Sequence, residues 1–130
     1  MSTPCIMVGR FGYRGAKPFG DSDSETVVVD CRSLEDPCFV KGPDGKVSKR
    51  KMRLEQMKAE LLRDQYHKTM KLSNKVVEAV VAGKNVCVKC MMGKNRSQCV
   101  VSIALDQLKG EHNHILFQGP VYLGNIVKTK

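Results

Sequence analysis

Four short apolar runs along the chain predict the strands of a sheet. Residues 5–8 form the first run, and the β-branched run at residues 26–30 is typical of a parallel strand at the centre of a sheet. Apolar and polar positions alternate over residues 85–89, which predicts the next strand, and residues 114–117 give the last one. We expect the residues from Pro120 onward to form a tail.

Apolar positions with helical spacing predict three helices. The first covers about residues 48–71, the second has Ser73 as its N-cap and stops before Gly83, and the third covers residues 94–109. Because strands and helices alternate, the fold class is predicted to be α/β. We expect a single three-layer domain over residues 1–130, with a mainly parallel central sheet flanked by helices.

Length and composition agree with one domain in a reducing compartment. The chain has 130 residues, of which 42% are hydrophobic, enough for one core. It contains no apolar run long enough to cross a membrane, and residues 1–4 lack the features of a signal peptide. We therefore expect a cytoplasmic protein without membrane contacts. The six cysteines are interpreted as buried small residues.

The net charge of +9 favours an anionic partner such as RNA, DNA or a phosphorylated metabolite. Positive charge is concentrated around the start of the first predicted helix, where a solvated helix face is the alternative interpretation. The residues assigned to this basic surface are Lys46, Lys49, Arg50, Lys51 and Arg53, and Lys58 adds a sixth charge nearby. Protein partners and self-association are left open.

The strongest candidate for a binding site is the strand–loop–helix passage at residues 86–97. A helix start presents unpaired N–H groups and the positive end of its dipole, so the loop is suited to an anion. Arg96 can add a two-pronged hydrogen bond to a phosphate group, and Lys94 a point charge. Cys87 and Cys90 have the spacing of half a zinc site, but no second pair of ligands follows. We expect a phosphate site without metal or cofactor.

A glycine-rich loop at residues 9–15 follows the first predicted strand. Its glycines allow the backbone to turn tightly and to approach a ligand. Arg10 and Arg14 can meet phosphates, and Tyr13 can stack on a base. The alternative interpretation is a loop whose aromatic residues fill the core.

A further anion contact is predicted where the strand at residues 26–30 ends. Open α/β sheets bind ligands at this edge, and Arg32 lies there in the sequence. Asp30 is interpreted as a residue that orients Arg32 or a neighbouring N–H.

The pattern Cys-x5-Arg-Ser at residues 90–97 resembles the phosphate loop of cysteine-dependent phosphatases. That chemistry needs a thiolate nucleophile beneath a ring of N–H groups and an Arg that clasps the phosphoryl oxygens. The resemblance implies Cys90 as the nucleophile, Arg96 as the clamp and Ser97 as a hydroxyl that helps the thiolate leave. Asp36 and Asp64 are the candidates for a general acid.

A second resemblance covers more of the chain. The segment at residues 9–15, then the segment at residues 28–37, then the loop at residues 90–97 resemble, in the same order, motifs of the C-terminal domain of the RapZ family of RNase adaptors. The resemblance implies an α/β domain with an anion pocket at the strand ends. It also implies binding of small RNA or an amino-sugar phosphate rather than catalysis. The positions that carry over are Arg10, Tyr13, Arg32, Cys90, Gly93, Arg96 and Ser97.

The chain departs from both families within the loop. Met91 and Met92 replace a Thr and a Gly of the RapZ motif, and Asn95 replaces its His. Lys89 stands where many cysteine phosphatases carry His. The kinase-like half of RapZ proteins has no counterpart in this sequence.

The leading hypothesis is an anion-binding domain that binds RNA or a phosphorylated metabolite through the loop and the basic surface, without catalysis. The alternative is a cysteine phosphatase that uses Cys90 and Arg96. A third interpretation is a small component of a larger ribonucleoprotein. The residues predicted to contact the anion or RNA are Arg10, Tyr13, Arg14, Arg32, Gly93, Lys94, Asn95, Arg96 and Ser97.

Overall fold

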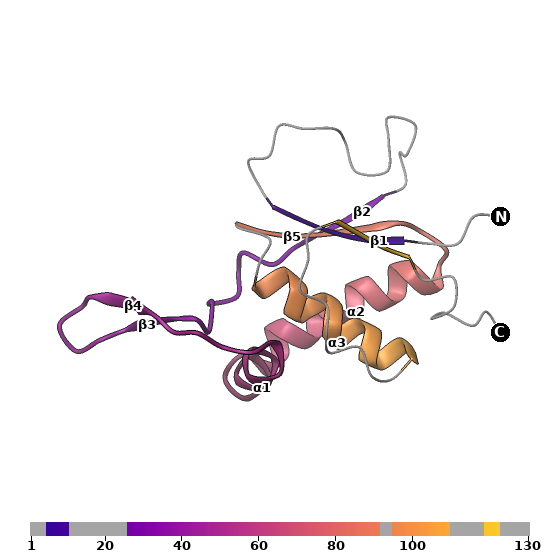
Figure 1. The fold of residues 1–130 in the computed structure, drawn as a ribbon. Helices are drawn as coiled ribbons and strands as arrows, with labels where there is room; N and C mark the ends of the chain where they lie inside the picture. Colours follow the sequence, from indigo (N-terminus) through magenta and orange to yellow (C-terminus); the bar gives the residue numbers. More distant parts are fainter. Residues whose placement is uncertain (1–4, 11–25, 92–94, 110–118, 123–130) are drawn as a thin grey trace.

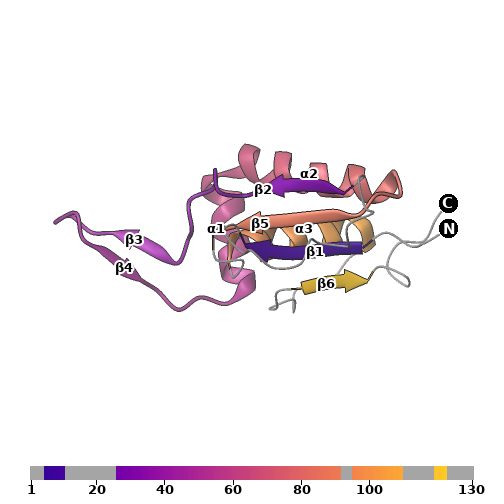
Figure 2. The same cartoon turned by 90° about the horizontal axis from the view of Figure 1, so that it is seen from above.

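A four-stranded sheet forms one layer of the computed structural model, which describes residues 5–10, 26–91, 95–109 and 119–122. The strands β1 (Cys5–Arg10), β2 (Val27–Asp30), β5 (Val86–Cys90) and β6 (Gly119–Tyr122) lie in the order β2-β5-β1-β6 (Figures 1 and 2). β5 pairs in parallel with both β1 and β2, and β6 is antiparallel to β1. The prediction of a mainly parallel sheet in an α/β fold is confirmed.

Two strand predictions need correction. β2 lies at an edge of the sheet and not at its centre, although it is parallel as expected. Gly119–Tyr122 forms β6, where a tail was predicted. The strand predicted at residues 114–117 lies outside the described residues.

Three helices accompany the sheet: α1 (Leu54–Asp64), α2 (Tyr66–Val81) and α3 (Arg96–Lys109). α2 and α3 pack against each other and cover the same face of the sheet, while α1 lies beside their ends (Figure 1). The third layer of the predicted architecture therefore stays a prediction, because both helices that the structure describes on the sheet share one face. None of the three helices combines the length and the apolar character needed to cross a membrane.

The first predicted helix, at residues 48–71, is wrong at its start. β3 (Phe39–Lys41) and β4 (Val47–Lys49) form an antiparallel hairpin there, which projects away from the sheet (Figures 1 and 2). The turn chemistry explains the difference. The Gly42 N–H donates to the Lys46 carbonyl at 2.8 Å, and Gly45 adopts a φ of 81°, which favours glycine.

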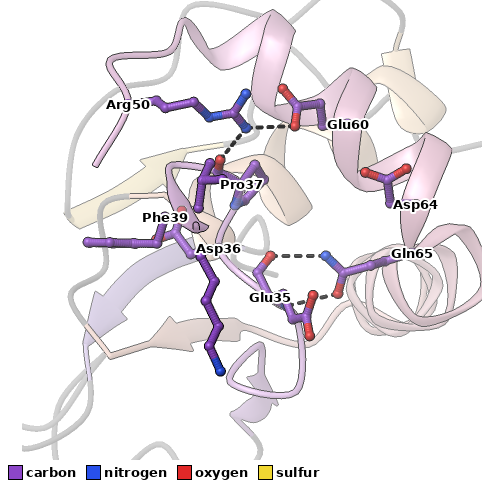
Figure 3. A pocket seen from close by; sticks show the side chains of 10 residues that line it. Glu35, Asp36, Pro37, Phe39, Arg50, Glu60, Asp64 and Gln65 are labelled. Carbon is purple, nitrogen blue, oxygen red and sulfur yellow. Dashed lines mark hydrogen bonds and ion pairs between the residues drawn. The ribbon is translucent and has the colours of Figure 1, made fainter. Parts of the chain in front are cut away.

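The break between α1 and α2 lies at Gln65 and not before Ser73. The Gln65 side chain accepts from the Glu35 N–H at 2.8 Å and donates to the Glu35 carbonyl at 3.0 Å (Figure 3). These bonds hold the non-helical backbone of Gln65 in place. Ser73 is buried inside α2, where its hydroxyl donates to Gln107 of α3. Gly83 follows the C-cap of α2 with a φ of 78°, as predicted.

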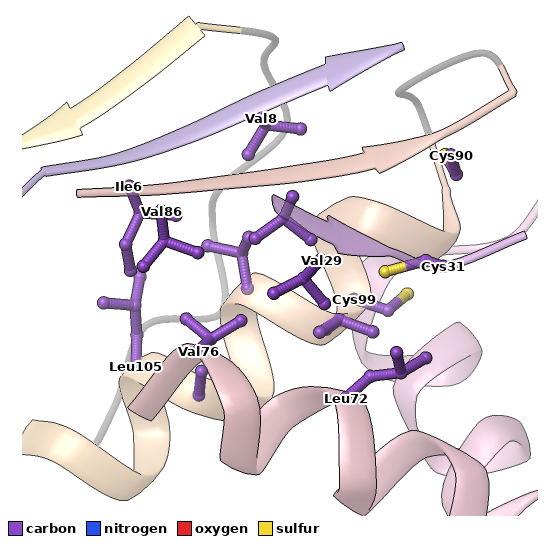
Figure 4. Close-up of a cluster of buried hydrophobic side chains, with 14 of the residues drawn as sticks. Ile6, Val8, Val29, Cys31, Leu72, Val76, Val86, Cys90, Cys99 and Leu105 are labelled. Atoms are coloured by element: carbon purple, nitrogen blue, oxygen red, sulfur yellow. The ribbon is translucent and has the colours of Figure 1, made fainter. Parts of the chain in front are cut away.

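The core lies between the sheet and the two helices (Figure 4). On β5 the alternate residues Val86, Val88 and Cys90 join this core, since successive side chains of a strand point to opposite faces. The predicted stripe on α3 is buried against them. Its members are Val100, Val101, Ala104 and Leu105, with Leu108 partly buried.

Candidate functional site

The carboxyl ends of three parallel strands meet at one edge of the sheet. Arg10 at the end of β1 is the register partner of Cys90 at the end of β5, and Asp30 at the end of β2 is the partner of Lys89. The chain then passes from Cys90 through the loop into α3. Three segments that sequence analysis singled out separately are thus brought to the edge where open α/β sheets bind ligands.

Arg96, the first residue of α3, is fixed by backbone groups. Its Nη1 donates to the Leu34 carbonyl at 2.9 Å and to the Arg32 carbonyl at 3.3 Å. Its Nε is buried and has no hydrogen-bond partner in the part of the chain that the structure describes. The guanidinium therefore joins α3 to the segment after β2 through one nitrogen, and holds a second donor in the interior of the site.

Cys90 and Ser97 are in contact beneath the loop. The Cys90 thiol donates to Ser97 Oγ at 3.2 Å, and both side chains are buried. Ser97 lies in the first turn of α3. The contact therefore joins the end of β5 to the start of α3, across a separation of seven residues. If the thiol were ionised, the same hydroxyl would be placed to donate to the thiolate.

Arg32 is held by Asp30. Its Nε and Nη2 donate to the two carboxylate oxygens of Asp30, at 3.0 and 2.8 Å, and its backbone N–H donates to the same carboxylate at 2.9 Å. The Arg32 guanidinium keeps the pKa of Asp30 below its usual range, chiefly through these hydrogen bonds. The interpretation of Asp30 as the residue that orients Arg32 matches this geometry. The pair is half-exposed, so Arg32 offers less net positive charge to an anion than an unpaired guanidinium would.

The Asp36 side chain contacts the start of α3. The sequence gives no local signal for this contact. Asn95, the residue before α3, donates from Nδ2 to Asp36 Oδ2 at 2.9 Å, and its carbonyl accepts the first helical hydrogen bond from Cys99. Asp36 Oδ1 accepts from the Cys38 N–H at 2.9 Å. Oδ2 therefore joins the segment after β2 to the start of α3, while the bond to Oδ1 stays within that segment. Asp64, the other candidate acid, pairs with Arg63 on α1.

Two further buried thiols, Cys31 and Cys99, belong to the same core cluster as Cys90 (Figure 4). Burial raises the pKa of Cys31 far above its ordinary value and that of Cys99 to about 12, so both stay protonated at neutral pH. Cys87 is also buried, but it lies three positions before Cys90 on β5 and so faces the other side of the sheet. Cys87 and Cys90 cannot share a metal ion. Across the described ranges, no three His, Cys, Asp or Glu residues are grouped as metal ligands.

The predicted basic surface divides into two parts. Lys46, Lys49, Lys51 and Arg53 are exposed on and after the hairpin. Arg50 is instead committed to the fold, since its Nη2 donates to the Pro37 carbonyl at 2.6 Å and to Glu60 Oε1 at 2.8 Å. Lys58 is buried, with its Nζ 2.5 Å from Asp106 and 3.3 Å from Glu55, and so does not belong to the surface.

Some candidate residues are not described. Tyr13, Arg14, Gly93 and Lys94 lie outside the described residues, and for Arg10 only the backbone position in β1 is known. The geometry of the site thus rests on Cys90, Asn95, Arg96 and Ser97, together with the segment after β2 that they contact.

A pocket of about 320 Å³ adjoins the site and was not foreseen from the sequence (Figure 3). It opens between the base of the hairpin, the segment before it and the end of α1. Asp36 lines this pocket and also bonds Asn95, so the pocket and the loop share a wall. The other residues that line it include Glu35, Phe39, Lys41, Glu60 and Asp64.

Comparison with known proteins adds no assignment. No protein-family model, no curated protein and no solved structure matches this chain. The resemblances to RapZ proteins and to cysteine phosphatases therefore rest on the motifs alone.

Proposed function

We propose that this protein is a phosphate-binding domain that binds RNA or a phosphorylated metabolite at the loop of residues 90–97. The observation that carries the proposal is the buried Nε of Arg96. A buried donor without a partner costs about 1–3 kcal/mol, which an oxygen of a bound phosphate would offset. Because two backbone carbonyls hold Nη1, the other edge of the guanidinium is oriented in advance.

The surroundings of Arg96 support an anion more than a neutral ligand. α3 has 14 residues and begins at Arg96, so the positive end of its dipole faces the loop. The net charge of +9 adds long-range attraction for polyanions. In the proposal, Arg10 and Arg32 approach the same phosphate from the neighbouring strand ends, in a three-layer domain of the RapZ C-terminal type.

Phosphate binding is tested by thermal unfolding of the full chain with increasing inorganic phosphate. Phosphate should raise the melting temperature of the wild type, and Arg96→Lys should lose this shift, because lysine keeps the charge but not the guanidinium edge. Arg63→Lys, an exposed arginine on α1, is the matched control and should keep the shift. A full phosphate shift in Arg96→Lys would contradict the proposal, whatever its starting melting temperature.

If the ligand is RNA, a separate result is expected for its binding affinity. Its affinity should fall steeply as salt rises, since phosphate contacts release counterions, and Arg10→Ala or Arg96→Ala should weaken it further. RNA affinity that is indifferent to salt and to both substitutions would exclude RNA and leave the phosphorylated metabolite.

A cysteine phosphatase is the second candidate, favoured by the contact between Cys90 Sγ and Ser97 Oγ. In this reaction the Cys90 thiolate attacks phosphorus and forms an S–P bond, while the P–O bond to the leaving group breaks and a general acid protonates the leaving oxygen. Water then hydrolyses the phosphocysteine, which releases phosphate and restores the thiolate. Asp36, one of the candidate acids, accepts hydrogen bonds from Cys38 and Asn95 with its two carboxylate oxygens, which favours binding over catalysis. Hydrolysis of an aryl phosphate between about pH 5 and 8, abolished by Cys90→Ser with phosphate binding retained, would establish the phosphatase. Absence of turnover over that range would exclude it.

A further inference from the structure

We call the β3–β4 hairpin, residues 39–49, the arm. In its register Phe39 pairs with Lys49 and Lys41 pairs with Val47. Cross-strand partners and alternate residues share a face of a hairpin, so these four side chains lie together on one face. Every residue of both strands is exposed, and Phe39 and Val47 remain 50% and 63% accessible.

The arm is presented in a fixed direction rather than packed into the core. It extends away from the sheet and helices (Figures 1 and 2). At its base, the Arg50 N–H donates to the Cys38 carbonyl at 2.6 Å, and the Arg50 side chain bonds Glu60 of α1. At its tip, Asp44 accepts from the Lys46 N–H at 3.0 Å. Asp44 is the sole carboxylate between residues 39 and 49, and this bond keeps it in the turn, away from the four-residue face.

An exposed aromatic ring between lysines is suited to a single-stranded nucleic acid. Bases of any sequence stack on an aromatic face, while neighbouring cations meet the phosphates. We propose that this face of the arm binds single-stranded RNA, with Phe39 stacked on a base and Lys41 and Lys49 against the adjacent phosphates. The inference rests on the proposed function in taking RNA, rather than a metabolite, as the ligand of the loop.

The pocket connects the arm with the loop. Phe39 and Lys41 line the pocket as well as the arm, and Asp36 lies beside Phe39 in the same pocket (Figure 3). The Asp36 carbonyl accepts from the Phe39 N–H at 3.1 Å, and its side chain bonds Asn95, the residue before α3. A strand with one phosphate at Arg96 can therefore continue over the pocket to Phe39. Four carboxylates line the pocket and repel phosphates: Glu35, Asp36, Glu60 and Asp64. Carboxylate oxygens such as those of Glu35 can accept hydrogen bonds from the amino groups of bases, which favours bases turned inward there.

A protein partner fits this face less well. The centres of protein interfaces are depleted in lysine, whereas here two lysines alternate with the two apolar residues. The mixed face, on a chain with a net charge of +9, matches a polyanion with flat apolar groups.

The test measures binding of the full chain to a fluorescent single-stranded RNA of about 16 nucleotides and to the same RNA as a duplex. Phe39→Leu keeps an apolar side chain but removes the ring, and should weaken single-strand binding on the order of ten-fold with little effect on the duplex. Lys41→Gln combined with Lys49→Gln should weaken binding and lower its salt dependence. Lys71→Gln combined with Lys75→Gln, which removes the same charge from exposed positions on α2, is the matched control.

The outcomes separate the arm from the loop. Wild-type single-strand affinity in both Phe39→Leu and the arm lysine variant would overturn the inference, and a phosphate shift that still depends on Arg96 would leave the proposed function standing. Equal losses of RNA affinity in the arm lysine variant and the α2 control would show that the arm lysines contribute only general positive charge. That result would also overturn the inference. RNA-independent association of the chain that Phe39→Leu abolishes, seen by sedimentation, would assign the face to a second copy instead. RNA binding that depends on the arm residues but not on Arg96 would support the arm as an RNA site. The same result would contradict the loop as the site of the RNA phosphate.

Discussion

At the edge of the sheet, Arg96 and Cys90 are embedded in packed and hydrogen-bonded surroundings, whereas on the arm Phe39, Lys41 and Lys49 stand exposed on strands with no buried residue. The loop residues bond segments that are far away in the sequence, and the arm residues bond mainly their neighbours in the hairpin. The charged side chain at the loop therefore contributes to the stability of the fold, whereas the charged side chains on the arm do not. Substitutions should separate the two regions by their effect on stability.

The largest contrast is expected between core and arm. Leu105 on α3 is fully buried among the residues beneath the sheet, so Leu105→Ala should lower the free energy of unfolding by about 2–5 kcal/mol. Val47→Ala removes a similar apolar group from the exposed arm and should change it by less than about 0.5 kcal/mol. Urea unfolding measures both. A loss above about 1 kcal/mol for Val47→Ala would mean that the arm is packed in solution.

The buried thiols beneath the loop should make the fold sensitive to alkali. Cys99 has an ordinary pKa of 9.0, which burial raises to about 12 in the folded protein. Between these values the unfolded chain has lost the proton that the folded protein keeps, so stability is complete below pH 9 and falls as the pH rises toward 12. Each such thiol contributes a slope of up to about 1.4 kcal/mol per pH unit.

The alkaline effect is measured by urea unfolding of the wild type and of Cys99→Ala from neutral to alkaline pH. The variant starts less stable because it leaves a cavity, but its stability should fall less steeply with pH. Identical slopes in the two proteins would show that Cys99 is not buried as a thiol in solution.

The base of the arm gives an intermediate effect. Arg50→Gln removes the bonds to Pro37 and Glu60, which are partly exposed, so the global free energy of unfolding should fall by about 1 kcal/mol or less. Backbone amides of the arm should exchange with deuterium several-fold faster, because the hairpin loses its attachment to α1. Arg63→Gln, which removes another partner of Glu60, is the control and should leave exchange in the arm unchanged.

Sequence patterns predicted the packed region well and the arm poorly. The stripe on α3 is set by burial against the core, so its period is visible in the sequence. On β5 Val86, Cys87 and Val88 are all buried, so the strand is marked by a short apolar run. The arm has no buried face, and its basic residues are ordinary helix formers, so a helix was predicted across β4. Gly42 and Gly45 are turn signals in the sequence, but they do not indicate that the short segments on either side pair as strands.

The candidate site shows the same division. Its location and the closeness of Cys90 to Ser97 follow from a strand, a short loop and a helix, which are local features. The contacts of Asp36 with Asn95 and of Arg96 with Leu34 span 59 and 62 positions, and no local pattern indicates them. These long-range contacts show that Asp36 links two distant segments, and they fix the orientation of Arg96.

The last comparison makes the same change in both regions. Gly45 in the arm and Gly83 after α2 both have positive φ, and a Cβ at either position would meet no atom within 4 Å. Substitution by Ala therefore costs only backbone strain, about 1 kcal/mol at each site. Gly83→Ala should lower the global free energy of unfolding by this amount, because Ala79 and Val80 in the last turn of α2 are packed in the core. Gly45→Ala should change it by a few tenths at most and appear instead as faster deuterium exchange in the arm. Equal losses in urea unfolding would show that the arm unfolds together with the core, which would remove the distinction between the two regions.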